Sequence, residues 1–137
     1  GATGIHIYVP LVPKYTYDVT RQLAGYVGKV IAAALPDKAT NERLVKKRGP
    51  RVYIDHLQNL PGKTIVAAYS ARPKRGAPVS VPFDWDELDT VDPLHFTLKD
   101  LDQLLQRPPH LDDMERRRQN IDALLPLIRG EIGTDPR

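Results

Sequence analysis

Alternating apolar and polar residues predict that the chain opens with a short strand over residues 5–9. Ile5, Ile7 and Val9 would share one face of this strand, and His6 and Tyr8 would share the other. Prolines follow within a few positions and end the element. The pattern therefore predicts a strand that presents a histidine on the face opposite its apolar side chains.

The next pattern has helical spacing and covers residues 16–35. Thr16 is placed to cap this helix, Asp18 suits its positive N-terminal end, and Pro36 stops it. An amphipathic helix with one apolar stripe is expected. The stripe consists of Val19, Leu23, Val27, Val30, Ile31 and Ala34.

Two further strands are predicted over residues 51–57 and 63–70. The turn sequence Asn59-Leu-Pro-Gly62 separates them, which favours an antiparallel hairpin. Residues 71–83 are expected to be an extended loop. The tail has helical character near residues 84–88, 97–106 and 112–129, and Pro126 is expected to end or kink the last segment.

These elements predict an α/β fold with a largely antiparallel sheet packed by helices. Residues 1–83 would form a sheet and helix carrying the site, and residues 84–137 a helical tail. A length of 137 residues corresponds to one domain or part of one. Because the chain opens on a glycine turn that leads at once into a strand, we expect it to be the C-terminal portion of a longer protein.

Charge is unevenly distributed along the chain. Residues 1–75 hold 13 Lys and Arg against 4 Asp and Glu, whereas residues 76–137 hold 7 against 13. The first part is a candidate surface for a polyanion, and the alternative is an ordinary solvated basic face. The absence of cysteine excludes disulfides and thiolate zinc sites and fits a cytoplasmic protein. No apolar run is long enough for a transmembrane helix, so no membrane partner is expected.

Asp55 lies among apolar residues near the end of a predicted strand. Burying a carboxylate there would be costly unless a cation pairs with it, and a divalent metal is a common partner beside phosphates. The alternative is a strand-end aspartate that hydrogen-bonds a neighbouring turn. Near it, Arg48 could neutralise a phosphate through its planar fork, and Gln58 could bond a sugar or base.

A glycine turn at the start of the chain is a second candidate. Gly1, Thr3 and Gly4 would let backbone N–H groups approach an anion, with His6 beside them as a donor to phosphate. A purely structural histidine is the alternative. Arg72 would reach the site from the end of the next strand, unless it is a surface arginine of a basic loop.

Two charged motifs are interpreted as structural. Asp84 and Asp86 resemble a two-carboxylate metal motif, but they open a predicted helix, where aspartates act as caps and dipole partners. The run Arg116-Arg-Arg118 is expected to lie on a solvated face. The sequence contains no GxSxG, HExxH or Walker A motif, so hydrolase triads, zinc proteases and P-loop enzymes are not supported.

Taken together, the motifs resemble the polymerase domain of bacterial DNA ligase D, a member of the archaeo-eukaryotic primase superfamily. The likeness extends from residue 1 to about residue 88. It includes the glycine turn with His6, the Asp-x-x-Gln-Asn of Asp55 to Asn59, the Gly-Lys-Thr of Gly62 to Thr64 and the Tyr-Ser-x-Arg of Tyr69 to Arg72. The Gly-Ala-Pro-Val-Ser of residues 76–80 and the Trp-x-Glu-Leu of residues 85–88 complete it.

This resemblance implies a primase-like polymerase palm, present here as a partial domain, that adds nucleotides to DNA ends in non-homologous end joining. It implies Mn²⁺ or Mg²⁺, two ions in the full domain, with Asp55 as a catalytic metal ligand. The implied nucleotide-binding residues are Gly1, Thr3, Gly4, His6, Arg48, Gln58 and Arg72, and the implied nucleic-acid-binding residues are Lys46, Lys47 and Lys63.

The implied partners are DNA ends with a recessed or gapped primer, nucleoside triphosphates, ligase and nuclease modules, and a Ku-type end-binding protein. Localisation would be cytoplasmic, at the bacterial nucleoid. The sequence departs from the family in lacking the Asp-x-Asp motif that precedes the glycine turn, and the serine before Gly1. This chain alone is therefore expected to be inactive. The rival interpretations are a non-catalytic module that binds nucleic acid or nucleotides, and a structural fragment.

Overall fold

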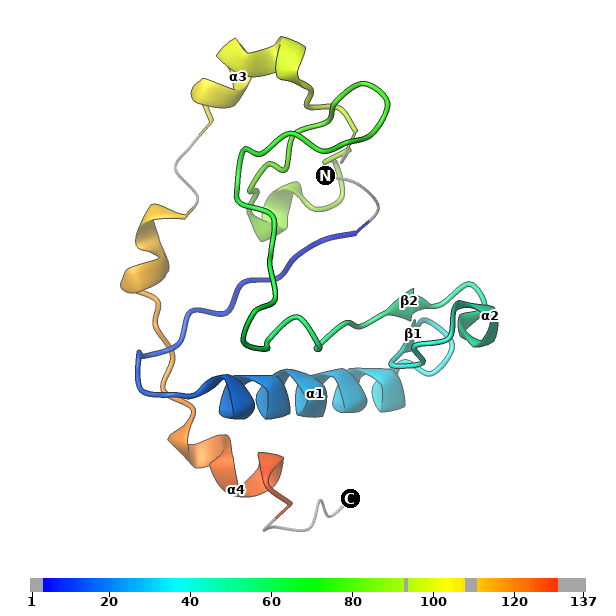
Figure 1. Ribbon diagram of the computed structural model, residues 1–137, viewed down its shortest axis with the longest axis vertical. Helices are drawn as coiled ribbons and strands as arrows, with labels where there is room; N and C mark the ends of the chain where they lie inside the picture. Colours follow the sequence, from blue (N-terminus) through cyan, green and yellow to red (C-terminus); the bar gives the residue numbers. More distant parts are fainter. Residues whose placement is uncertain (1–3, 93, 108–110, 131–137) are drawn as a thin grey trace. The chain divides into compact units, whose positions relative to one another are not determined.

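The computed structural model describes residues 4–92, 94–107 and 111–130 (Figure 1). The chain divides into two compact units. Unit 1 comprises residues 1–10 and 65–119, and unit 2 comprises residues 11–64 and 120–137. Each unit therefore combines segments that are far apart in the sequence. Gly1 and Thr3, two residues of the predicted anion-binding turn, lie outside the described residues.

The long helix α1, Tyr17–Ala34, confirms the helical pattern of residues 16–35. Thr16 caps it as predicted, since its hydroxyl accepts a hydrogen bond from the backbone N–H of Val19. The predicted apolar stripe is only partly covered, because Val27, Val30 and Ile31 are exposed. Among the residues of α1, only Gly28 is buried.

Neighbouring segments of unit 2 approach α1 most closely at two glycines, and not at its large apolar residues. A Cβ atom at Gly28 would lie 2.6 Å from Asn41 Nδ2 and 3.3 Å from Ile54 Cγ2. One at Gly25 would lie 3.3 Å from His56 Cδ2. The absence of a side chain at both positions lets residues 54–56 run directly over the helix, as Figure 1 shows for the chain that follows β2.

Two short strands of unit 2 pair in parallel, which corrects the predicted antiparallel sheet. Strand β1, Ala39–Thr40, pairs with β2, Val52–Tyr53, in the register Ala39 to Val52 and Thr40 to Tyr53. The connection between them holds the four-residue helix α2, Val45–Arg48. A parallel pair needs such a crossover, and this one carries the cationic residues between the two strands.

The predicted strands at residues 5–9 and 63–70 are wrong. The structure has no strand over either segment, and Ile5, Ile7 and Val9 are exposed. A strand requires a partner for its backbone groups, and alternation alone does not supply one. The predicted hairpin fails for the same reason, because residues 63–70 do not pair with β2.

Unit 1 is organised by isolated antiparallel bridges around residues 78–79. Ala71 pairs with Val79, and Pro78 pairs with Thr97. Val79 and Pro78 are the largest fully buried side chains. The predicted extended loop of residues 71–83 is thus the centre of this unit, and Tyr69 turns the chain into it with a left-handed φ of 61°.

The tail is helical only in short pieces. The segments predicted near 84–88 and 97–106 are confirmed by the 3-10 helices η1, Trp85–Glu87, and η2, Leu98–Asp100, and by α3, Leu101–Leu105. The predicted helix over 112–129 is instead η3, Asp112–Glu115, η4, Asp122–Leu124, and α4, Leu125–Ile128. Pro126 lies in the first turn of α4 and does not end or kink it, because proline has no N–H to donate and a first turn needs none.

No helix within the part of the chain that the structure describes is long and apolar enough to cross a membrane.

Candidate functional site

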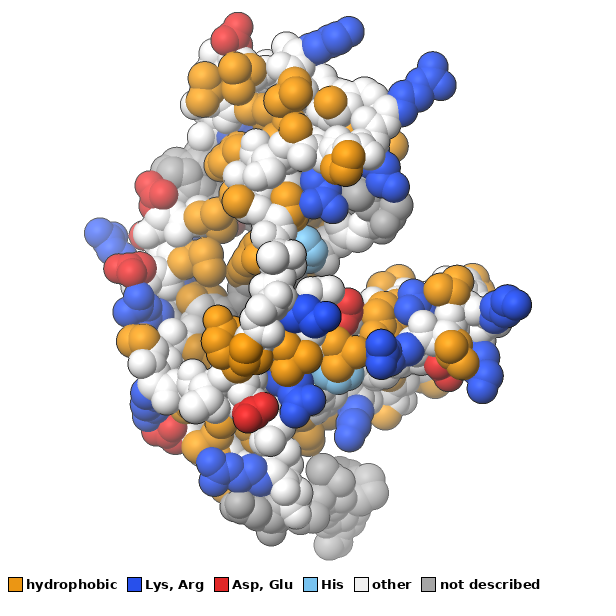
Figure 2. Space-filling model, viewed as in Figure 1, with side chains coloured by type: hydrophobic (Ala, Val, Ile, Leu, Met, Phe, Trp, Pro, Cys, Tyr) orange, Lys and Arg blue, Asp and Glu red, His pale blue; other side chains and the backbone are white. Residues whose placement is uncertain are grey.

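The crossover between β1 and β2 holds five of the cationic residues of unit 2. Lys46, Lys47 and Arg48 form the last turn of α2, and Arg51 follows. Figure 2 shows Lys and Arg side chains over this part of the surface. Lys46 and Lys47 are exposed, and their predicted contact with a nucleic-acid backbone stays a prediction.

Arg48 is held in place by contacts within this crossover. Its Nε donates to the carbonyl of Glu42 at 2.8 Å and its Nη2 to the carbonyl of Arg43 at 2.7 Å. The guanidinium also lies 3.8 Å from the centre of the Tyr53 ring. Because a guanidinium has five N–H donors, two bonds leave donors for a phosphate. The predicted phosphate role of Arg48 is thus compatible with a fixed, partly buried side chain.

Asp55 lies just beyond β2 and is exposed, which corrects the expectation of a carboxylate buried within a strand. Its Oδ1 accepts a hydrogen bond from the backbone N–H of Leu57 at 2.9 Å. This is the local turn contact that the sequence left open as the alternative. The pairing of β2 stops at Tyr53, so the carboxylate never enters the apolar interior. The contact uses one oxygen, and Oδ2 remains accessible to a cation.

The residues after Asp55 complete a turn. Asn59 Nδ2 donates to the carbonyl of His56 at 3.2 Å, and the backbone N–H of Leu60 donates to the carbonyl of Gln58. Gln58 is exposed, as is Lys63 a few residues later. The family-like Asp-x-x-Gln-Asn sequence therefore forms a surface turn in which Asn59 is structural and Gln58 is free to meet a ligand.

The remaining predicted site residues belong to unit 1. Gly4 and His6 are exposed, and the His6 ring meets the Tyr8 ring edge to face at 6.5 Å between centroids. Arg72 is half-buried, and its backbone N–H donates to the carbonyl of Pro78 at 2.8 Å. The structure thus groups His6 with Arg72 in one unit and Arg48 with Asp55 in the other. Their convergence on a single site stays a prediction.

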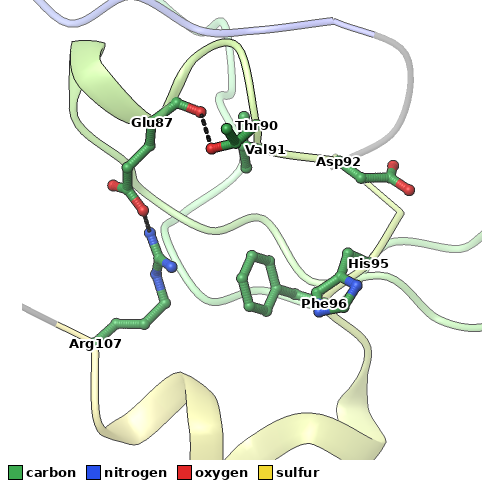
Figure 3. Close-up of a pocket in the computed structure, with 7 residues that line it drawn as sticks. All are labelled: Glu87, Thr90, Val91, Asp92, His95, Phe96 and Arg107. Atoms are coloured by element: carbon green, nitrogen blue, oxygen red, sulfur yellow. Dashed lines mark hydrogen bonds and ion pairs between the residues drawn. The ribbon is translucent and has the colours of Figure 1, made fainter.

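A second cluster of unit 1 surrounds the Trp-x-Glu-Leu motif, and Figure 3 shows its side chains. Glu87 Oε1 and Arg107 Nη2 form an ion pair at 2.6 Å, with the guanidinium 5.0 Å from the centre of the Phe96 ring. Glu87 Oε2 accepts from the backbone N–H of Asp84, which completes a capping box. The interpretation of Asp84 as a cap is therefore confirmed.

The arginine run in the tail forms ion pairs with acidic residues close to it in sequence. Arg116 and Arg117 pair with Asp113, and Arg118 pairs with Glu115. Arg116 and Arg117 are largely exposed, which confirms the solvated face. This segment offers no separate cationic site, because its charges are locally balanced.

A metal centre cannot be built from the residues at hand. Across residues 4–92, 94–107 and 111–130, no three His, Cys, Asp or Glu side chains gather as a metal-binding group. Asp55 is therefore a single candidate ligand, and a centre of two ions does not fit the described side chains.

The sequence interpretation missed His56, which lies beside the candidate ligand. Its ring packs against Gly25 of α1, and its Nδ1 is buried without a hydrogen-bond partner among the described residues. The available signal was the Gly25/Gly28 spacing on one helix, which marks a close approach of another segment.

Comparison with known proteins gives a consistent result. The family described as the LigD primase-polymerase domain matches residues 1–111. The chain is 38% identical over 100 residues to the bifunctional non-homologous end joining protein LigD of Bacillus subtilis, covering 72% of this chain and 16% of that protein. It is 31% identical over 137 residues to the multifunctional non-homologous end joining protein LigD of Pseudomonas aeruginosa, covering 97% and 16%.

A third relative, the multifunctional non-homologous end joining protein LigD of Mycolicibacterium smegmatis, is 30% identical over 114 residues, or 83% of this chain and 15% of that protein. The chain spans about one sixth of the length of these relatives. The family match covers both the turn at Asp55 and the cluster at Glu87. The chain therefore belongs to the LigD primase-polymerase domain family.

Proposed function

We propose that this chain forms part of a nucleotidyltransferase site that extends primer ends during double-strand break repair. The observation that carries the proposal is the exposed Asp55 carboxylate, which follows β2 in the same unit as the cationic crossover. A metal-nucleotide complex requires an accessible carboxylate together with cations that neutralise phosphate, and this unit holds both. Membership of the family supports the same conclusion.

The reaction we propose is in-line attack of a primer 3′-hydroxyl on the α-phosphate of a nucleoside triphosphate. A new bond forms between the primer oxygen and the α-phosphorus, and the bond to the β-phosphate oxygen breaks, so that pyrophosphate leaves. Arg48 would neutralise phosphate charge with its free donors, and Gln58 would bond the sugar or base. Lys46, Lys47 and Lys63 would contact the backbone of the DNA.

The proposed role of Asp55 is to provide one ligand for Mn²⁺ or Mg²⁺. The further ligands would be carboxylates other than those the structure describes, so we derive no step through the metal. The proposed partners are recessed or gapped DNA ends, nucleoside triphosphates, ligase and nuclease modules, and a Ku-type protein. All of these follow from the family and not from a contact in the structure.

A non-catalytic binding module is the second candidate, and the lone carboxylate favours it. Primer extension by the full-length gene product, with Mn²⁺ and ribonucleotides, separates the two. Asp55→Asn is expected to lower extension at least about a hundredfold, because it removes a charged metal ligand. Asp37→Asn, which neutralises another exposed carboxylate of unit 2, is the matched control and should leave extension unchanged.

The 137-residue chain tested alone is expected to show no extension, since one carboxylate cannot hold two ions. Full activity of the Asp55→Asn variant would remove Asp55 from the mechanism, and a lack of extension by the unmodified full-length gene product would support the binding module. Robust extension by the 137-residue chain would contradict the metal count.

A further inference from the structure

A hollow in unit 2 is bordered by one side of α1, the end of α4 and the ring of His56. Its volume is about 480 Å³. Among the residues that the structure describes, the lining includes three cationic residues and no Asp or Glu. The residues that matter for its chemistry are Arg21, Gln22, Lys29, His56 and Arg129.

Helical spacing places the α1 residues in one row. Arg21, Gly25 and Lys29 are four residues apart, so they follow one another along one face of the helix. Gly25 leaves room in the middle of the row, where the His56 ring lies. The row presents a cation at each end with an imidazole between them.

Two polar atoms of this hollow are desolvated and have no partner. Arg21 Nε and His56 Nδ1 are buried, and neither makes a hydrogen bond to any described residue. The nearest acidic contact of Arg21 is weak, since Asp18 Oδ1 lies 3.6 Å from Nη2. Both atoms are closed to solvent, so a ligand in the hollow would meet Arg21 at the outer end of its guanidinium, in a side chain that is 41% exposed.

We propose that this hollow binds the phosphodiester backbone of a nucleic-acid strand. The exposed end of the Arg21 guanidinium would donate to phosphate oxygens, and Lys29 would add a second charge. Arg21 and Lys29 are eight positions apart, a rise of about 12 Å along the helix. That length exceeds one phosphate group and suits successive phosphates of a strand.

This site adds a second contact region to the nucleic-acid role proposed above, on which it rests. The sequence of unit 2, residues 11–64 and 120–137, carries twelve Lys and Arg against seven Asp and Glu, so its field favours a polyanion. The hollow uses side chains that are outside the predicted set of Lys46, Lys47 and Lys63.

The first test is binding of a labelled single-stranded oligonucleotide to the 137-residue chain, by fluorescence anisotropy over a range of salt concentrations. The double variant Arg21→Gln with Lys29→Gln is expected to bind roughly tenfold more weakly or worse. The plot of log K against log salt should become less steep, its slope smaller in magnitude by about 1.4, which corresponds to two lost phosphate contacts on a single strand. The control with the same loss of charge is Lys38→Gln with Lys99→Gln, two exposed residues outside the hollow and outside the cationic crossover.

A direct measurement follows the Arg21 Nε–H signal by NMR, assigned by its loss in Arg21→Lys. The oligonucleotide should shift this signal at concentrations where inorganic phosphate does not. An unchanged signal with both probes would overturn the site. An equal response to inorganic phosphate at matched phosphate concentration would overturn the assignment to a strand.

Equal weakening by the control variant would also overturn the proposal, because charge alone would then explain binding. Thermal unfolding of each variant shows whether it remains folded, and Lys29→Gln alone, an exposed change, tests the site if the double variant unfolds. Binding is read without extension. A failure of the polymerase proposal at Asp55 therefore leaves this test intact.

Discussion

The ion pair between Glu87 and Arg107 should stabilise unit 1 measurably, whereas an exposed pair of similar length should not. The Arg107 side chain is 15% exposed and that of Glu87 is 33% exposed, and their closest atoms are 2.6 Å apart. We consider the double-mutant cycle of Glu87→Gln and Arg107→Gln. The cycle isolates the pair from the other contacts of each side chain.

Arg107 makes three contacts whose loss can be estimated. Exposed pairs contribute about 0.2–1 kcal/mol, and breaking fully buried pairs costs about 3–5 kcal/mol, so this partly covered pair should couple by roughly 1.5 kcal/mol. The single change Arg107→Gln also weakens a 3.3 Å hydrogen bond to the carbonyl of Pro82 and the contact with the Phe96 ring. Together these losses should lower the free energy of unfolding by about 2–3 kcal/mol.

The matched control is the pair Glu115–Arg118, with 2.7 Å between its closest atoms and side chains that are 81% and 38% exposed. Its cycle should show a coupling of no more than about 0.5 kcal/mol, because solvent screens both charges. The two pairs differ in burial and hardly in length. The comparison therefore tests whether coverage, and not distance, sets the energy.

Urea unfolding followed by tryptophan fluorescence measures both cycles. Trp85 is the single tryptophan of the chain and belongs to η1, so it reports on the unit that holds both pairs. Circular dichroism recorded in parallel shows whether the transition is two-state. Couplings that agree within about 0.3 kcal/mol would refute the argument from burial.

Two further predictions concern stability. Gly28→Ala should lower the free energy of unfolding by about 1–2 kcal/mol despite the better helix propensity of alanine, because the new Cβ would lie 2.6 Å from Asn41 Nδ2. Thermal melts should show a smaller loss for Gly25→Ala, because the atom nearest to its Cβ is 3.3 Å away. The second prediction concerns unfolding in acid. Hydrogen bonds from the backbone N–H and the hydroxyl of Thr97 lower the pKa of Asp100 below 3.8. Hydrogen bonds from Lys14 and Tyr15 lower the pKa of Asp122 in the same way. A carboxyl group whose pKa is lower in the folded state stabilises the fold at pH values above its unfolded pKa. Both contributions to the free energy of unfolding should therefore be complete above about pH 4 and disappear as the pH falls through the folded pKa values. Urea midpoints that do not change across that range would contradict this prediction.

Local signals in the sequence predicted the helices well where the end of the element was encoded by its own residues. Thr16 and Asp84 cap helices as expected, because a cap needs only residues three positions away. Strands were predicted poorly, because pairing depends on segments far away. Residues 5–9 alternate as a strand should, yet the structure gives their backbone no ladder partner.

The sequence predicted which residues belong to the candidate site, but it did not predict how exposed Asp55 is or what packs around it. Asp55 was expected to be buried because Ile54 precedes it and Leu57 follows it. Burial depends on how far β2 extends, and its pairing with β1 ends where Tyr53 meets Thr40, the last residue of β1. His56 was missed because its ring packs into a space left by Gly25, which lies 31 positions earlier in the sequence. A glycine does not stand out in a hydrophobic pattern, so the pattern gave no sign of this contact.

The local hydrogen bond of Asp55 and the proposed metal role are not alternatives. The bond from Leu57 N–H to Oδ1 fixes the carboxylate at 2.9 Å from the turn, which lowers the conformational entropy that a free aspartate would lose on binding a cation. A metal ligand must be accessible, and its side chain must also be oriented. An exposed side chain such as that of Asp55 is oriented by a local hydrogen bond of this kind. Asn59 stabilises the same turn through the carbonyl of His56, so the turn links the orientation of Asp55 to the ring that borders the hollow on α1. The contact that first argued for a purely structural aspartate therefore supports its use as a ligand.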